Sequence, residues 1–403
     1  MRIAVHLMLG VVVVPVLLVA VTLIVFSLIY SPAYVVRVIT FGVASVDDYQ
    51  KFPERLLGAS RNPFQLSTDL DETHVRSLFQ PIFHTDDLDA FLGQKHTQAF
   101  IVIQDDTVLY EHYFNGARRD SIVTSFSMAK SFDSALIGSA IADGAIHGVD
   151  DPITRYLPEL AARDRRFSQV TIRNLLMMSS GIKYAEAFGF WGDDARTYYD
   201  PDLRQLALHE TQIVDPPGRS FLYNNYHPLL LGMILERTTG MTVTRYLQAK
   251  IWGRIGTEYG GSWSTDRAGG LEKLESGINA RAIDFAKFGR LYLQRGTWDG
   301  AQVVPSSWID ESTQEAASVG ASYYPHDGFI PIPGNGYYGY LWWGMRRENG
   351  MNDFYARGQY GQFIYISPQT NLIIVRNGRD WGIDGDAWVK AFYAFASALE
   401  AKR

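Results

Sequence analysis

The longest uncharged stretch of the chain lies near its N-terminus. From Leu7 to Tyr30 no residue is charged, and Val, Leu and Ile dominate. A helix of this length matches the roughly 30 Å hydrocarbon core of a bilayer, and Pro15 is tolerated in a spanning helix. The alternative is a signal peptide cleaved near residues 31–33, but its apolar core would usually be shorter. The pattern therefore predicts a transmembrane anchor over residues 1–30, with a cytoplasmic N-terminus and an extracytoplasmic body.

The pattern of hydrophobic and polar residues changes after Tyr30 and again near residue 98. Residues 31–97 mix aromatic, proline and charged residues without a sustained period, which indicates a lead-in segment that drapes over the body. Two runs rich in β-branched and aromatic residues then flank the polar pair Asp105-Asp106. Such a pattern predicts a β-hairpin over 98–114, at the start of a domain that covers 98–403.

Helical and strand-like patterns follow in order along this domain. The predicted helices cover 127–143, 170–178 with Thr171 as cap, 229–236, 280–294 with Asn279 as cap, a helix starting at 306, and 387–399. The predicted strands cover 338–344, 361–366 and 372–376. Strands at both ends of the domain predict an α+β fold. Its one antiparallel sheet is built from 98–114 and 338–376 and has flanking helices, and a mainly helical region of about 127–310 is inserted between the two parts of the sheet.

Two long segments of the helical region are predicted as loops. The stretch 253–277 is rich in glycine, and 183–200 is rich in aromatic and acidic residues, including Phe188 and Trp191. The second segment is either a wall over a site or a surface loop that buries its aromatic residues beneath it. We expect it to be a wall or lid.

Composition restricts the classes of function. The formal charge is -6 over 403 residues, so there is no basic footprint for nucleic acid. The chain has no cysteine, which excludes disulfides, thiolate metal sites and a cysteine nucleophile. Neither His-Glu-x-x-His nor Gly-x-Ser-x-Gly occurs, so we expect no metal site, no cofactor and no α/β-hydrolase elbow. Four histidines are assigned no role: His84, His96, His112 and His227.

One short motif carries candidate chemistry. Ser127-Met128-Ala129-Lys130 stands at the predicted start of a long apolar helix. A lysine three positions after a serine lies one helical turn on, over the same face, so its amine can reach the hydroxyl. A serine nucleophile needs a neighbour that takes its proton, and a lysine can do so only if the fold buries it. The alternative is a helix N-cap hydroxyl with a solvated lysine.

The same spacing occurs a second time, from Ser180 to Lys183. Spacing alone is therefore weak evidence for a nucleophile. Ser180 and Gly181 follow an apolar run, 175–178, and are typical of a helix C-terminus with a glycine cap. Context thus favours Ser127 over Ser180.

Five sequence landmarks follow one another along the chain. They are Ser127–Lys130, Asp150-Asp151-Pro152 through Pro158, Thr171–Leu176 with Ser179-Ser180-Gly181, Pro217-Gly218, and Tyr223-Asn224-Asn225. In this order they resemble the serine β-lactamase and penicillin-binding-protein superfamily, in the class C-like branch that includes family VIII esterases and 6-aminohexanoate-dimer hydrolases. The resemblance covers about residues 98–400 and implies a β-lactamase/transpeptidase-like fold.

The resemblance implies a role for each matching residue. Ser127 would be the acylated nucleophile, and Lys130 would accept its proton or lower the pKa of a neighbouring group. Tyr223 would be a second base, which protonates the leaving group and later activates water. Asn225 would hold Lys130 and the substrate carbonyl. Read alone, Tyr223 would be a core tyrosine with a satisfied hydroxyl.

A strand that lines the site is the third element of this family, and Ala356-Arg357-Gly358-Gln359 stands in its place. The resemblance implies that Gly358 lets substrate approach closely and that the N–H groups of Gln359 and Ser127 form an oxyanion hole. Penicillin-recognising members carry a cation where this chain has Ala356. Arg357 would point to the opposite face of the strand and is a poor substitute.

Together these features lead us to expect a membrane-anchored serine hydrolase that cleaves small amides or esters through an acyl-enzyme at Ser127. A D-Ala-D-Ala peptidase or β-lactamase with the same machinery is one alternative, which Ala356 makes less favourable. A catalytically inactive penicillin-binding-like module that senses or scaffolds at the membrane is the other. The expected partners are a small-molecule substrate and the lipid bilayer.

Overall fold

The computed structural model describes residues 2–187, 189–315, 323–324, 330–348 and 350–401, and for 2–13 and 15 only the backbone. The strands are β1 (Glu54–Leu57), β2 (Ser67–Thr68), β3 (Thr97–Gln104), β4 (Thr107–Tyr113), β5 (Val123–Thr124), β6 (Gly261–Ser264), β7 (Ile278–Ala280), β8 (Thr297–Trp298), β9 (Ala301–Gln302), β10 (Gly336–Tyr338), β11 (Trp343–Met345), β12 (Asp353–Gly358), β13 (Gln362–Ser367) and β14 (Leu372–Gly378). The α-helices are α1 (Arg2–Tyr30), α2 (Pro32–Phe41), α3 (Glu72–Phe83), α4 (Leu88–Gln94), α5 (Ala129–Ala142), α6 (Pro158–Arg163), α7 (Ile172–Leu176), α8 (Asp193–Tyr199), α9 (Leu203–Gln205), α10 (Tyr226–Thr239), α11 (Val243–Lys250), α12 (Ala282–Leu293), α13 (Ser306–Thr313) and α14 (Gly385–Glu400).

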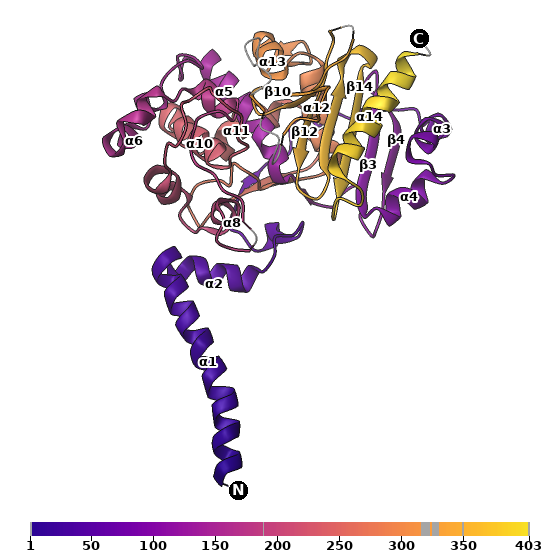
Figure 1. Ribbon diagram of the computed structural model, residues 1–403. Helices are drawn as coiled ribbons and strands as arrows, with labels where there is room; N and C mark the ends of the chain where they lie inside the picture. Colours follow the sequence, from indigo (N-terminus) through magenta and orange to yellow (C-terminus); the bar gives the residue numbers. More distant parts are fainter. Residues whose placement is uncertain (1, 188, 316–322, 325–329, 349, 402–403) are drawn as a thin grey trace.

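The large sheet joins the start and the end of the domain 98–403. Its strand order is β10-β11-β12-β13-β14-β3-β4-β2, and β14 pairs with β3 in an antiparallel register that sets Ile373 opposite Ile103. Figure 1 shows the late strand β14 lying beside the early strands β3 and β4. The predicted sheet from both chain ends is thus confirmed. One pair departs from it, because β2 of the lead-in segment runs parallel to β4.

Strand β13 shows why the centre of this sheet is buried on both faces. Successive side chains of a strand point to opposite faces. Phe363 and Tyr365 pack against Phe392 of α14, whereas Ile364 faces Gly289 of α12, where an added Cβ would lie 2.8 Å from its Cγ2. Helices α14 and α12 therefore cover opposite faces of the sheet.

A second sheet, of order β1-β6-β7-β5, leads into the inserted helical region. Strand β5 pairs with β7, and the N–H of Ser125, directly after β5, donates to the carbonyl of Ile278 at 2.8 Å. Helix α5 starts four residues later and packs against α10 and α11. The segment between β5 and α5 is thereby fixed at the junction of the two sheets and the helical region.

Several short elements differ from the predictions. The predicted strand 338–344 is two strands, β10 and β11, joined by a turn. The lead-in 31–97 is partly regular, because it contains α2, α3, α4, β1 and β2. The predicted loop 183–200 contains α8, and the predicted loop 253–277 contains β6. Phe188 lies outside the described residues. Most of these elements, such as β1, β2 and β6, have too few residues to show a period, and tertiary contacts stabilise them instead.

Asn279 does not cap a helix, which corrects the prediction. It lies in β7, and its side-chain amide donates to the hydroxyls of Ser262 and Ser264 at 3.2 and 3.1 Å. Helix α12 starts at Ala282 and has no side-chain cap. By contrast Thr171 caps α7 as predicted, in a reciprocal capping box with Asn174.

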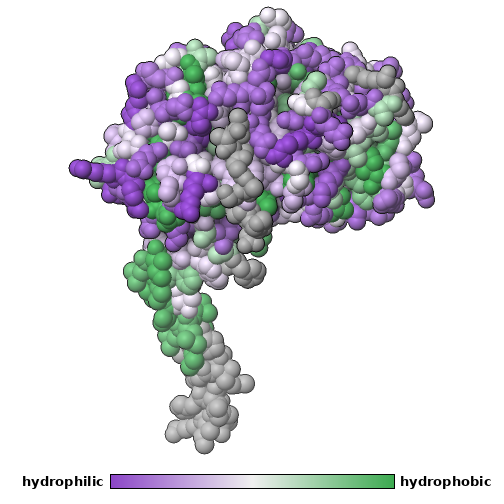
Figure 2. Space-filling model, turned by 45° about the horizontal axis from the view of Figure 1, so that its top comes forward, coloured by the Kyte–Doolittle hydropathy of each residue, from purple (hydrophilic) through white to green (hydrophobic). Residues whose placement is uncertain are grey.

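The N-terminal helices project from the body. Helix α1 runs away from it, and α2 turns beneath α8 (Figure 1). Among the described residues no single helix passes a test of length and hydropathy for crossing a membrane, but Val16–Tyr30 and Pro32–Phe41 pass it as a pair, bent by 118°. Figure 2 shows the described part of α1 as a hydrophobic column below a largely hydrophilic body.

Candidate active site

Ser127 lies at the first turn before α5. A short 3-10 turn covers Phe126–Met128, and the α-helix follows from Ala129, close to the predicted start. Phe126 has φ of 42°, in the left-handed region that costs a bulky residue about 1–3 kcal/mol. Its ring packs between Tyr198 and Tyr360. The backbone strain directly before Ser127 is therefore held by aromatic packing on both sides.

The side chains of Ser127 and Lys130 are brought together. Lys130 Nζ donates to Ser127 Oγ at 2.8 Å and to the backbone carbonyl of Glu275 at 2.9 Å. Lys130 is only 1% exposed, whereas Ser127 is partly exposed. The solvated-lysine alternative is therefore wrong. A buried amine now lies within hydrogen-bonding distance of a hydroxyl that a substrate can reach.

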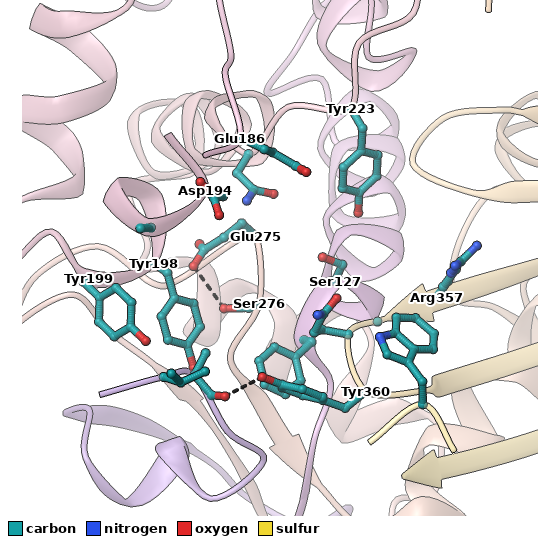
Figure 3. A pocket seen from close by; sticks show the side chains of 18 of the residues that line it. Ser127, Glu186, Asp194, Tyr198, Tyr199, Tyr223, Glu275, Ser276, Arg357 and Tyr360 are labelled. Carbon is teal, nitrogen blue, oxygen red and sulfur yellow. Dashed lines mark hydrogen bonds between the residues drawn. The ribbon is translucent and has the colours of Figure 1, made fainter. Parts of the chain in front are cut away.

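Tyr223 comes from the segment before α10 and lies over the same pair. Its ring centroid is 4.8 Å from Lys130 Nζ, and the ring stacks on Trp343 of β11 at 5.5 Å. In Figure 3 the Tyr223 hydroxyl points towards Ser127. Two segments almost a hundred residues apart in sequence thus meet at one place.

Asn225 lies beside this group with different partners from those the resemblance implied. Its side-chain amide donates to the Tyr184 hydroxyl at 2.8 Å and to Thr197 Oγ1 at 3.3 Å. In the described part of the chain the second acceptor for Lys130 is the Glu275 carbonyl, not Asn225. The amide instead ties the start of α10 to the 183–200 segment.

Strand β12 passes close to the serine. A Cβ added at Gly358 would lie 2.2 Å from the carbonyl oxygen of Ser125, so only glycine fits there. Gln359 follows at the end of the strand and lines the same cavity as Ser127. Ala356 is fully buried, and no basic side chain can act from that position.

Arg357 lines the cavity but is directed away from the serine in Figure 3. Its guanidinium donates to Asp386 Oδ1 at 2.8 Å and lies over the rings of Trp381 and Trp343, with its carbon 5.1 and 6.0 Å from the centroids. Arg357 was expected on the opposite face of the strand from the site, but it lines the cavity, with its guanidinium paired to Asp386.

These residues surround a cavity of about 570 Å³ (Figure 3). Its lining combines the candidate catalytic groups with many aromatic and aliphatic side chains. The lining residues are Val43, Ala44, Phe126, Ser127, Glu186, Gly189, Phe190, Asp194, Ala195, Tyr198, Tyr199, Tyr223, Asn225, Glu275, Ser276, Trp343, Arg357, Gly358, Gln359, Tyr360 and Trp381. The 183–200 segment forms one wall, as predicted. The contributions of Val43, Ala44, Glu275 and Ser276 were not predicted, because their segments carry no recognisable motif.

Two buried ionisable groups lie near Lys130. Asp133, one turn further along α5, is fully buried, and neither of its carboxylate oxygens has a hydrogen-bond partner among the described residues. Burial raises the pKa of Asp133 well above its ordinary value, and the charge of Lys130 opposes this shift. Burial, helped by Lys130, lowers the pKa of His227 to about 3, so His227 is neutral near pH 7.

The second Ser-x-x-Lys sequence does not form a similar pair. Ser180 is buried, and its hydroxyl lies 2.6 Å from His227 Nε2, whereas Lys183 is exposed. Ser180 also accepts a hydrogen bond from the N–H of Ile182. This serine therefore stabilises the turn after α7, in agreement with the sequence context.

The described residues include no group of three or more His, Asp or Glu side chains that could hold a metal ion.

A family model described as Beta-lactamase matches residues 88–382, almost three quarters of the chain. The chain belongs to the beta-lactamase family. Membership makes it a β-lactamase-related hydrolase.

Individual proteins that are similar to this beta-lactamase family member are consistent with the family assignment. The 6-aminohexanoate-dimer hydrolase of Paenarthrobacter ureafaciens is 27% identical over 300 residues, which cover 72% of this chain and 74% of that protein. A putative 6-aminohexanoate-dimer hydrolase from Bacillus anthracis superposes with a TM-score of 0.75 at 24% identity, over 89% and 94% of the two chains. The octameric penicillin-binding protein homologue from Pyrococcus abyssi gives a TM-score of 0.59 at 21% identity, over 82% and 78%. The two structures support the fold.

Proposed function

We propose that this protein is a membrane-anchored serine hydrolase that cleaves small amides or esters through an acyl-enzyme at Ser127. The observation that carries the proposal is the 2.8 Å contact between Ser127 Oγ, at the cavity wall, and the buried Lys130 Nζ. A solvated lysine could not serve as a base, and a buried serine could not meet a substrate. Here each group has the exposure that its role requires.

In the proposed reaction Ser127 Oγ attacks the carbonyl carbon of the substrate. The hydroxyl proton passes to Lys130 Nζ, so the hydrogen bond between them reverses its donor for this step. Electron density moves to the carbonyl oxygen, which the N–H groups of Ser127 and Gln359 would bind. The carbon–nitrogen or carbon–oxygen bond then breaks, and Tyr223 delivers a proton to the leaving amine or alcohol. The Tyr223 phenolate then takes a proton from water, and the hydroxide attacks the acyl carbon. The bond from this carbon to Ser127 Oγ breaks, the acid leaves, and Oγ regains its proton from Lys130.

The cavity walls favour neutral amides or esters over penicillin-like substrates. Ala356 offers no cation for a substrate carboxylate, and the Arg357 guanidinium is engaged by Asp386. Glu275 in the lining is paired with the buried Lys273 at 2.7 Å, so this lysine is not available to a substrate carboxylate either. The name of the Paenarthrobacter relative, a 6-aminohexanoate-dimer hydrolase, supports a linear amide as one substrate class.

Labelling with a fluorophosphonate probe tests the nucleophile. We expect a single adduct on Ser127, which intact mass and peptide mapping locate, and its loss in Ser127→Ala. Ser180→Ala is the matched control, because it removes the serine of the other Ser-x-x-Lys sequence. An unlabelled but folded wild-type protein would indicate the inactive scaffold instead. Labelling by fluorescent penicillin would indicate the peptidase or β-lactamase.

The anchoring part of the proposal rests on the N-terminal helices. Exposed aliphatic side chains cover the described half of α1, for example Leu18, Ile24 and Leu28 at 62, 59 and 82% exposure. Water-exposed apolar surface of this extent is unfavourable, and a bilayer would cover it. Carbonate extraction of membranes, followed by protease treatment of intact spheroplasts, tests both anchoring and an extracytoplasmic body. A protein released by carbonate, or one protected from the protease, would contradict it.

A further inference from the structure

Helix α2 has an inner face that packs tightly on the catalytic body. Tyr34, Val35 and Val38 are buried and form a small cluster with Ala195 and Tyr199 of α8. The Tyr34 hydroxyl donates to the carbonyl of Phe190 in the same wall segment. Helix α2 is therefore packed against the 183–200 wall of the cavity and is not a free linker.

The residues directly after α2 belong to the cavity itself. Val43 and Ala44 line it. The Tyr199 hydroxyl donates to the carbonyl of Gly42 at 2.6 Å, and the Tyr360 hydroxyl donates to the carbonyl of Ala44. Val43 is 78% exposed although it lines the cavity, so it marks the cavity mouth. The mouth thus lies at the end of α2.

The outer face of α2 is apolar as well. Val36 and Ile39 are 59 and 60% exposed, and the exposed positions of α2, which also include Pro32, Ala33 and Thr40, carry no charged residue. A surface helix in water normally carries charged residues on its outer face. This surface continues into α1, whose Leu28 and Ile29 are also exposed. The two helices meet at 118°, so a membrane-spanning α1 leaves α2 closer to the plane of the membrane than to its normal.

We propose that α2 lies in the membrane interface, with Val36, Ile39 and Val43 among the lipids, and that the cavity takes amphiphilic substrates directly from the bilayer. The substrate class is an amide or ester of a long aliphatic chain. This inference rests on the proposed hydrolase function and specifies its substrate.

The distribution of side chains in the cavity fits such a molecule. Val43, directly after α2, and Phe190 and Ala195, of the wall on which α2 packs, add apolar side chains to the lining, next to the carboxyl groups of Glu186 and Asp194. The reacting carbonyl would sit at Ser127, and the aliphatic chain would extend along the apolar wall towards the mouth. Burial of each further methylene against apolar side chains stabilises the bound substrate, so a longer chain should raise kcat/KM.

The placement of α2 can be measured directly because the chain has no cysteine. The full chain carrying Ile39→Cys, labelled with the environment-sensitive fluorophore NBD, is reconstituted into phosphatidylethanolamine and phosphatidylglycerol vesicles. We expect blue-shifted emission that spin-labelled lipids quench. Val214→Cys, at a position of similar exposure in another loop (61%), is the matched control and should report water. An aqueous signal from position 39 would overturn the placement.

The substrate class is tested in the same vesicles with p-nitrophenyl acetate and p-nitrophenyl decanoate. We expect kcat/KM for the decanoate to exceed that for the acetate at least about tenfold, since eight added methylenes enter an apolar wall. The double variant Val36→Asn/Ile39→Asn should lower this ratio severalfold. Leu70→Asn/Val214→Asn, which changes two equally exposed aliphatic residues elsewhere, should keep it.

The outcomes separate the two proposals. Equal kcat/KM for both esters, or a ratio that the α2 variant does not change, would overturn the inference while Ser127 acylation still supports the hydrolase. Absence of acylation by either ester would refute the hydrolase and with it the substrate class, and the NBD signal would still decide where α2 lies.

Discussion

Replacing Gly358 by alanine should slow the enzyme strongly and leave it folded. The new Cβ would lie 2.2 Å from the carbonyl oxygen of Ser125, whereas ordinary contacts begin at 3.4 Å. Strand β12 and the Ser125–Phe126 backbone must therefore separate by about 1.2 Å. Side-chain rotation cannot relieve this clash, because the atom that the Cβ meets belongs to the backbone.

That separation acts on the proposed oxyanion hole. Its two N–H donors, of Ser127 and Gln359, stand on the two segments that are forced apart. A misplacement of about 1 Å at a catalytic group can reduce the rate about 100-fold, which corresponds to about 2.7 kcal/mol of barrier. Overpacking of this kind usually destabilises a fold by only about 1–3 kcal/mol. We therefore expect Gly358→Ala to remain folded and to acylate about 100-fold more slowly.

The assay is the burst of p-nitrophenol on mixing with p-nitrophenyl acetate, followed by stopped flow, with urea unfolding of the same preparations. Gly289→Ala is the matched control, because its Cβ would lie 2.8 Å from Ile364 on the α12 face of the same sheet, away from the serine. Two results would refute the reasoning: a Gly358→Ala burst at the wild-type rate, or equal slowing in Gly289→Ala.

Three further predictions concern buried groups around the serine. Lys130→Met keeps an unbranched buried side chain but removes the amine, so the burst rate should fall about 10²- to 10⁴-fold; a normal burst would exclude Lys130 as the base. Because burial lowers the pKa of His227 to about 3, the unfolded chain takes up a proton that the folded chain does not between pH 6.5 and 3. Stability should therefore fall with decreasing pH in this window by up to about 1.4 kcal/mol per pH unit, and urea titrations of His227→Gln should show a flatter profile. Burial raises the pKa of Asp133, so the folded form retains a proton that the unfolded form loses above about pH 4. Through this group the wild type therefore loses stability as the pH rises, whereas Asp133→Asn does not, and the stability of this variant relative to wild type should increase from pH 5 to pH 8. A constant difference would contradict this.

The contacts that the sequence alone predicted are local in the chain. The approach of Lys130 to Ser127 follows from three residues of helical spacing, and the cap at Thr171 follows from its own turn. The position of β12 could be predicted because residues 356–359 match a family landmark. Each of these features depends on a few neighbouring residues, so a pattern in the sequence is sufficient to locate it.

The remaining features of the site depend on contacts between distant segments. The Glu275 carbonyl that binds Lys130 is a backbone atom of a glycine-rich stretch, and no side-chain pattern marks it. The mouth residues Val43 and Ala44 reach the cavity because Tyr199 and Tyr360 bind their segment. Helix α3 was missed because Pro81 lies inside it, and packing of Phe79 against Phe100 of β3 and Phe395 of α14 stabilises it. Tertiary structure therefore determines these parts of the cavity wall.

The pairing of β3 with β14 also affects when the protein becomes active during its synthesis. Arg376 of β14 donates to Thr97 of β3 across 279 positions of the chain. A ribosome adds about 5–20 residues per second, so many seconds pass between the synthesis of β3 and that of β14. During this time one edge of β3 is unpaired and can bind other strands. A nascent or prematurely terminated chain has the Ser127 segment but lacks the strands that complete the centre. Hydrolysis therefore begins only after the last strand has been made, and truncated products should be inert and prone to aggregate.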